Sequence, residues 1–222
     1  MRKLFGLILG LAAALIIANL WPHSPREEGP PPAGSAASVE NPVTRNPAAD
    51  ILLVNEWNPL PDDALPMELV TLFEYKNRNF GLAGSAIQLD KSVFEAADAM
   101  FAAAKRDGVD GFILTSGYRD REKQEALYSG NHNGMVARPG HSEHETGLAF
   151  DVTATGSEHG FDTTPQFAWL IQNCWDYGFI LRYPEGREAV TGIPYEPWHY
   201  RYVGLPHSRE IRDRGTLEEY LR

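Results

Sequence analysis

Residues 140–151 read GHSEHETGLAFD and combine two histidines with three acidic residues. Part of this stretch, residues 146–153, alternates in the way a β-strand does, because successive side chains of a strand point to opposite faces. The alternation places Asp151 on one face, with Ala149, and Phe150 on the other. We therefore predict a strand at 146–153 that presents a carboxylate opposite an aromatic face.

Short helices and strands are predicted on both sides of this stretch. Asp90 is a predicted helix cap, apolar residues then recur at helical spacing, and Gly108 follows the helix end. The predicted helices are 90–106, 120–129, 163–176 and 208–221, and the other predicted strands are 111–115, 179–183 and 198–203. Without a regular strand–helix alternation, these elements predict an α+β domain with a small, mainly antiparallel sheet and flanking helices.

Residues 1–21 predict a targeting segment. Two basic residues follow the first methionine, and an uncharged, mainly apolar run of 18 residues follows them. Such a run serves either as a membrane anchor or as a cleaved signal peptide. Residues 22–50 are rich in Pro, Gly and Ala and predict a linker. We expect residues 51–222 to form the folded domain, outside the cytoplasmic membrane and either anchored there or secreted to the cell envelope.

Composition excludes several classes of function. The formal net charge is −10, from 20 Lys and Arg against 30 Asp and Glu. Nucleic-acid binding requires clustered basic residues, so no nucleic-acid partner is expected. The single cysteine, Cys174, permits neither an intrachain disulfide nor a cysteine-based zinc site, and its apolar neighbours predict a buried core residue. We expect a monomer.

Two distant segments together carry a possible metal site. His144 precedes the strand that carries Asp151, and His199 begins another predicted strand. Two imidazoles and one carboxylate suit a zinc ion that keeps one open position for water, which is typical of catalytic sites. His141 lies three residues before His144, and spacing alone does not choose between them.

A possible base and a possible cation lie near these residues. Glu196 is three residues before His199, and Pro197 predicts a turn rather than a helix there. A carboxylate beside a metal-activated water is what a general base requires. Arg119 follows a predicted strand and could stabilise an oxyanion. The helical His-Glu-x-x-His zinc motif is absent, because Leu148 stands four residues after His144.

Several motifs together resemble one family. They are SGYRD at 116–120, Gln124, the pattern S-x-H-x-x-G-x-A-x-D at 142–151, GFILRYP at 178–184 and EPWHY at 196–200. In order and spacing they are similar to the VanY-type D-alanyl-D-alanine carboxypeptidases, which are zinc peptidases. The resemblance spans about residues 51–204.

The resemblance implies a role for each matching residue. It implies zinc ligands at His144, Asp151 and His199, and so favours His144 over His141. Glu196 would be the catalytic base, and Arg119 would assist the transition state. The resemblance also implies that four further residues contact substrate: Ser142, Gln124, Ser116 and Trp198.

The implied function is removal of the terminal D-alanine from peptidoglycan stem peptides by a zinc carboxypeptidase domain at residues 51–222. An L,D-carboxypeptidase acting on tetrapeptide stems is the nearest alternative, because pocket shape decides the stereochemistry. A non-catalytic zinc module that binds wall peptides is a third, although Glu196 and Arg119 argue against it. A serine mechanism of the penicillin-binding type is excluded by the lack of any Ser-x-x-Lys.

Overall fold

The computed structural model describes residues 51–61, 64, 66, 68–130 and 136–222. The predicted targeting segment (1–21) and linker (22–50) lie outside the described residues. Within the described ranges, none of the helices combines the length and the apolar character that a bilayer span needs.

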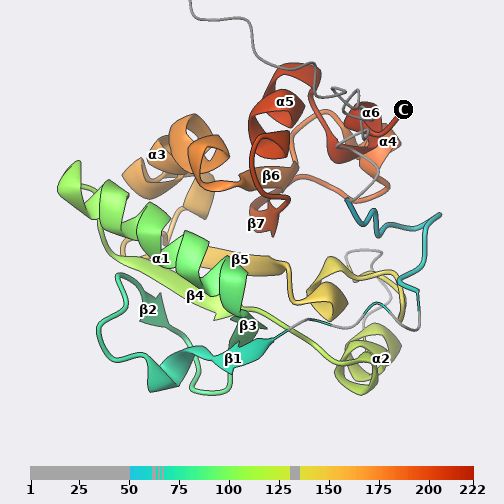
Figure 1. Ribbon diagram of the computed structural model, residues 1–222, viewed down its shortest axis with the longest axis horizontal. Coiled ribbons are helices and arrows are strands. Elements are labelled where there is room, and N and C mark those ends of the chain that lie inside the picture. The colour runs from blue at the N-terminus through green and yellow to red at the C-terminus, as the bar shows by residue number, and fades with distance from the viewer. Residues whose placement is uncertain (1–50, 62–63, 65, 67, 131–135) are drawn as a thin grey trace, which may run out of the picture. The chain divides into compact units, whose positions relative to one another are not determined.

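The main sheet confirms the predicted α+β class (Figure 1). Five of the described strands form it, in the spatial order β2 (Gly81–Leu82), β4 (Phe112–Ser116), β5 (Ala149–Ala154), β7 (Glu196–Tyr202) and β6 (Phe179–Tyr183). The β2–β4 pair is parallel, and the other three pairs are antiparallel. A separate two-stranded antiparallel sheet pairs β1 (Leu69–Thr71) with β3 (Gln88–Asp90), and the sequence did not predict it.

Helical segments connect the strands. The α-helices are α1 (Lys91–Arg106), α2 (Arg121–Ser129), α3 (Pro165–Asn173), α4 (Glu188–Thr191), α5 (His207–Arg214) and α6 (Leu217–Tyr220). The 3₁₀ turns are η2 (Leu72–Glu74), η3 (Glu143–Thr146), η4 (Phe161–Thr163) and η5 (Cys174–Tyr177). Side-chain caps begin three of the longer helices, because Asp90, Asp120 and Thr164 accept backbone N–H groups from the first turn.

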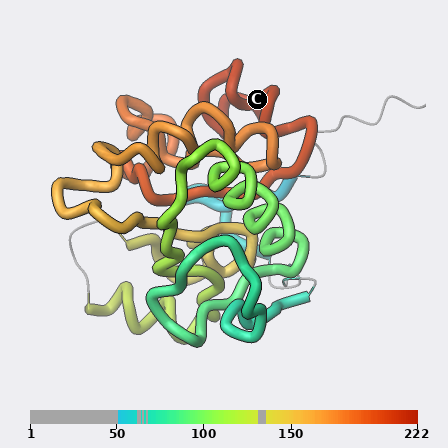
Figure 2. The backbone as a smooth tube through the Cα atoms, turned by 90° about the vertical axis from the view of Figure 1, so that its left-hand side faces the viewer, coloured from blue at the N-terminus to red at the C-terminus, as the bar shows by residue number. Residues whose placement is uncertain are grey.

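The core lies between α1 and the sheet. The apolar residues that recur at helical spacing along α1 are buried, and the Phe101 ring lies 4.7 Å from that of Phe112 and 6.1 Å from that of Phe150, centroid to centroid. Helix α1 thus runs along β4 and β5 in Figure 1, and its green coil faces the viewer in Figure 2. Cys174 is buried in this core, as predicted. Burial on this face leaves the opposite side of β5 for the polar site.

Two predicted elements differ from the structure in ways that matter near the site. The strand predicted at 146–153 begins only at Ala149, because Glu143–Thr146 form η3 and Gly147 ends that turn with a left-handed φ of 71°. The strand predicted at 198–203 begins earlier, at Glu196. The turn predicted for Glu196 is therefore wrong, since proline is tolerated near the start of a strand.

Two predicted helices are shorter than expected. The helix predicted at 163–176 ends at Asn173 and continues as η5. The helix predicted at 208–221 is split into α5 and α6 at Gly215, whose φ of 111° is incompatible with a continuous helix. The remaining predicted elements agree with the structure within one residue, and the strand at 179–183 agrees at both ends.

Candidate metal centre

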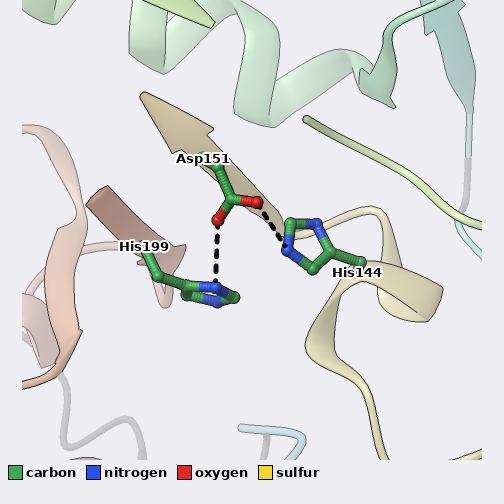
Figure 3. Close-up of side chains that lie close together, drawn as sticks. All are labelled: His144, Asp151 and His199. Carbon is green, nitrogen blue, oxygen red and sulfur yellow. Dashed lines mark ion pairs between the residues drawn. The ribbon is translucent and has the colours of Figure 1, made fainter. Parts of the chain in front are cut away.

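Three side chains from three elements converge on one point (Figure 3). His144 lies in η3, Asp151 in β5 and His199 in β7. Strands β5 and β7 are antiparallel neighbours, and their register places Asp151 directly opposite His199. Sheet pairing therefore joins segments that lie about fifty residues apart in the sequence.

The geometry of this cluster suits a cation. His144 Nε2 lies 3.3 Å from Asp151 Oδ2, and His199 Nδ1 lies 3.2 Å from Asp151 Oδ1. One ligand atom from each residue lies within 4.8 Å of the others. Asp151 Oδ1 is buried, yet it makes no hydrogen bond of acceptable geometry with any described residue. Two imidazole nitrogens and an under-satisfied carboxylate form a donor set that a divalent metal ion fits.

The other ring nitrogen of His144 is already engaged. His144 Nδ1 lies 2.7 Å from the carbonyl oxygen of Gly117 and donates to it, which leaves Nε2 unprotonated for a metal. Gly117 lies so close to the backbone of Gln88 that a Cβ at position 117 would overlap the carbonyl oxygen of Gln88. The glycine in the SGYR motif thus allows the close approach that orients His144.

His199 contacts a second carboxylate on the side away from Asp151. Its Nε2 lies 3.6 Å from Oε2 of Glu143, which is fully buried. Glu143 Oε1 lies 2.7 Å from Arg182 Nε and 2.9 Å from Arg201 Nη1. Sequence reasoning missed Glu143. Arg182 and Arg201, which lie among aromatic and apolar residues of the predicted strands, were the available signal, because buried cations require buried anions.

Charge within the cluster is distributed unequally. Burial lowers the pKa of His199, but the close contacts with the negatively charged Asp151 and Glu143 outweigh burial and raise it to about 9. Burial lowers the pKa of His144 despite Asp151. Burial alone would raise the pKa of Asp151, but the two histidines hold it well below its usual range. Without a metal, His199 is therefore protonated on both ring nitrogens at neutral pH, and a metal ion would displace one of these protons.

Glu196 begins β7 beside this cluster. Its Oε2 lies 3.5 Å from His199 Nδ1, on the same side as Asp151. The β6–β7 register shifts next to the pair formed by Tyr183 and Glu196, and such irregularities can redirect a side chain toward a site. Burial raises the pKa of Glu196 to about 7. A carboxylate with this pKa can both accept and return a proton near neutral pH.

Arg119 faces the same cavity from the loop after β4. Its backbone N–H donates to the carbonyl oxygen of His144, 3.2 Å away, which ties the loop to η3. Its buried Nε has no hydrogen-bond partner among the described residues. Burial lowers the pKa of Arg119, although Asp151 and Glu196 oppose the shift. The guanidinium is thus a largely buried cation beside the cluster, with one nitrogen that makes no hydrogen bond to a described residue.

A cavity of about 220 Å³ surrounds these groups. Gln124, Ser142 and Trp198 line it together with the three clustered residues, Glu196 and Arg119. Gln124 Nε2 donates to the carbonyl oxygen of Ala137 at 2.6 Å, while its buried Oε1 has no partner in the described part of the chain. Ser116 is paired with Asp151 across β4 and β5 but is not one of the described residues that line the cavity.

His141, the alternative ligand, has a different position. Its Nδ1 lies 2.7 Å from the carbonyl oxygen of Asn55, and it lines a neighbouring hollow of about 200 Å³. Within the described residues, the group able to hold a metal includes His144 and not His141.

The chain is similar to known proteins in both sequence and fold. The family model described as VanY, D-alanyl-D-alanine carboxypeptidase, matches residues 86–205. The chain therefore belongs to the VanY family of D-alanyl-D-alanine carboxypeptidases. A D-alanyl-D-alanine carboxypeptidase of Enterococcus faecium is 38% identical over 175 residues, which are 78% of this chain and 57% of that protein. The chain thus spans less than two thirds of the length of this relative.

Solved structures of two kinds of peptidase share the fold. The structure of the LdcB LD-carboxypeptidase matches with a TM-score of 0.68 and 33% identity, covering 79% of this chain and 87% of that one. A vancomycin-resistance D,D-pentapeptidase VanY in complex with Zn(II) matches with a TM-score of 0.63 and 35% identity, covering 77% of this chain and 98% of that one.

Proposed function

We propose that this protein is a zinc-dependent D-alanyl-D-alanine carboxypeptidase that removes the terminal D-alanine from peptidoglycan stem peptides. The observation that carries the proposal is the cluster of His144, Asp151 and His199, which lines one cavity together with Glu196. The pKa of Glu196 is raised to about 7, which suits a proton acceptor. Family membership and the Zn(II) complex of a related VanY support it.

Each residue of the site has a distinct task in this proposal. His144 Nε2, Asp151 and His199 Nδ1 hold the ion, whose bound form supplies Lewis acidity toward water and the scissile carbonyl. Glu196 accepts a proton as water attacks the carbonyl carbon, and it returns this proton to the leaving amine as the C–N bond breaks. The Arg119 guanidinium compensates negative charge that develops on the carbonyl oxygen.

The remaining cavity residues are proposed to hold the peptide. The free Oε1 of Gln124 is an acceptor for a substrate N–H group, because its own amide nitrogen is held by Ala137. Ser142 and Trp198 supply a hydroxyl and an apolar surface in the same cavity. Ser116 is a substrate contact by family resemblance alone, since it does not line the described cavity.

An L,D-carboxypeptidase is the second candidate. Its support is the TM-score of 0.68 to the LdcB LD-carboxypeptidase. The chemistry around the metal would be the same, and the two activities differ in the configuration of the residue that precedes the cut bond. Relatives named for D-alanyl-D-alanine hydrolysis favour the first candidate.

We further propose a location outside the cytoplasmic membrane for a monomeric enzyme. The basic, then apolar sequence of residues 1–21 supports export, and residues 22–50 would tether the domain near its polymeric substrate. Fractionation of cells that express the full chain, followed by gel filtration of the purified protein, tests location and monomeric state.

Product analysis tests the reaction. The zinc-loaded protein is incubated separately with a pentapeptide stem ending in D-Ala-D-Ala and with a tetrapeptide stem ending in a single D-Ala, and the products are identified by mass. The proposal expects loss of one alanine from the pentapeptide and little cleavage of the tetrapeptide. Preferential cleavage of the tetrapeptide would instead establish the second candidate, and no cleavage of either would reject both.

A further inference from the structure

A buried charge network lies behind the metal cluster, on the far side of the His199 ring. His199 Nε2 and Glu143 Oε2 are both buried, and each lacks a hydrogen bond of acceptable geometry to any described residue. They face each other at 3.6 Å. A buried polar atom without a hydrogen-bond partner is costly, so the contact between these two atoms matters to both.

Glu143 is held in place by two strands of the sheet. Arg182 comes from β6 and Arg201 from β7, and both guanidinium groups contact the same carboxylate oxygen, Oε1. Oε2 is left directed at His199. The two oxygens thus have separate partners, two cations on one side and an imidazole on the other.

The network continues to both ends of the domain. Arg182 also makes a two-pronged ion pair with Glu218 of α6, at 2.9 and 2.6 Å. Asn55, near the start of the described chain, donates to Glu218 at 3.0 Å. The two glutamates balance the two arginines, so the network is neutral without any contribution from His199. Glu143 therefore does not need the imidazole as a counter-ion, and a neutral ring can face it.

We propose that Glu143 is a positioning residue that fixes the tautomer of His199, with the proton on Nε2 and the lone pair of Nδ1 directed at the metal. The inference rests on the proposed zinc site. The Arg182–Glu218 pair supports it by holding the guanidinium against Oε1. Carboxylates that orient metal-binding histidines in this way typically change metal affinity about 10–100-fold when they are replaced.

Glu143→Gln tests this directly because an amide has only one oxygen. Two arginines compete for that oxygen at the Oε1 position, which turns the NH₂ group toward His199. An NH₂ donor favours a lone pair on Nε2 and hence a proton on Nδ1, the atom that must bind the metal. We expect zinc affinity, measured by competition with a chromophoric chelator, to fall about 10–100-fold.

Glu145→Gln is the matched control. Glu145 is a buried glutamate two residues further on, and it pairs with Arg121 and accepts the backbone N–H of Gly140. It is not part of the metal cluster or of the described cavity lining. Its replacement removes the same charge from the same segment, so a general loss of packing would weaken zinc binding equally in both variants. We expect the control to bind zinc with the wild-type affinity.

The outcomes separate this inference from the function on which it rests. Wild-type zinc affinity in folded Glu143→Gln would overturn the positioning role alone, and so would equal losses in Glu143→Gln and its control. A wild-type protein that binds no zinc would overturn the function as well. If Glu143→Gln does not fold, ¹⁵N NMR of the zinc-loaded wild type decides: a His199 protonated on Nε2 is expected, and zinc bound through Nε2 would overturn the inference.

Discussion

Two glutamates lie on opposite sides of one imidazole ring and differ sharply in character. Glu196 Oε2 is 3.5 Å from His199 Nδ1, and Glu143 Oε2 is 3.6 Å from His199 Nε2. Burial raises the pKa of Glu196 to about 7. Burial acts on Glu143 in the same direction, but Arg182 and Arg201 outweigh it and hold the pKa of Glu143 well below its usual range. Distance from the histidine therefore does not decide the state of either carboxylate.

The difference arises from what else each carboxylate touches. Glu143 is enclosed by guanidinium groups inside the sheet, so it stays ionised and serves as a fixed anion. Glu196 lines the same cavity as Glu143 but makes no ion pair with an arginine among the described residues, and the nearby charge of Asp151 further opposes its ionisation. A fixed anion suits the orientation of a ligand, and a titrating carboxylate suits proton transfer. The same residue type thus acquires two roles from its surroundings.

The largest expected effect is on catalysis by Glu196→Gln. Loss of the proton acceptor should lower kcat by about 10²–10⁴-fold, because general acid–base catalysis contributes this much. Zinc content should stay near that of the wild type, since Glu196 is not one of the three clustered ligands. Metal analysis and D-alanine release measured on one sample check this. Loss of zinc together with activity would show that Glu196 is structural.

Ligand replacement on the cavity side should have the next largest effect. His144→Ala removes a nitrogen from the cluster, whereas His141→Ala removes a ring bonded to Asn55 outside it. We expect zinc affinity to fall by at least about 100-fold in the first variant, because three protein ligands become two. The zinc affinity of His141→Ala should fall by less than about tenfold. A larger loss in His141→Ala than in His144→Ala would contradict the choice of ligand.

Zinc affinity should also depend on pH, because the metal ion competes with a proton for His199. The pKa of His199 is raised to about 9 in the metal-free state, so the ion must displace a proton at lower pH. Affinity should rise about tenfold per pH unit up to about pH 9, with one proton released. Calorimetry in buffers of different ionisation enthalpy counts this proton. A flat profile between pH 7 and 9 would show that His199 is already neutral.

The smallest expected effect is a contrast in stability. The pKa of Glu196 is raised above its unfolded value, so its stabilising contribution is present below about pH 4.5 and is lost as pH rises through 7. Metal-free Glu196→Gln should therefore melt a few degrees higher than the wild type at pH 8, which is about 1 kcal/mol. Glu143→Gln should melt lower, because the buried Arg201 loses its carboxylate partner and Arg182 keeps only Glu218. Shifts of the same sign would contradict the contrast.

The cavity side was largely predictable from sequence, whereas the buried side was not. Each cavity residue stands in a recognisable local motif, and pairing of β5 with β7 brings the motifs together; these residues are His144, Asp151, His199, Glu196 and Arg119. Family resemblance, rather than spacing, separated His144 from His141. Glu143 was missed because it stands between two motif positions, and only the folded sheet brings the arginines of β6 and β7 to it.

Element boundaries failed where local backbone chemistry overrode periodicity. The left-handed Gly147 and the 3₁₀ turn before it replaced the first residues of a predicted strand, and Gly215 divided a predicted helix. The β1–β3 sheet was missed because strands of three residues are too short to show a period of two. The order of strands in the sheet could not be predicted from local sequence patterns, because strand pairing depends on contacts between residues that are distant in the sequence.

Metal removal and titration test the central claim most directly. The purified full chain is stripped with a chelator, then titrated with zinc while D-alanine release from a pentapeptide stem is followed. Activity should vanish on stripping and return in proportion to zinc, reaching its maximum at one ion per chain, with none of this recovery in His144→Ala. Full activity in protein free of transition metal would show that the three side chains hold no catalytic ion.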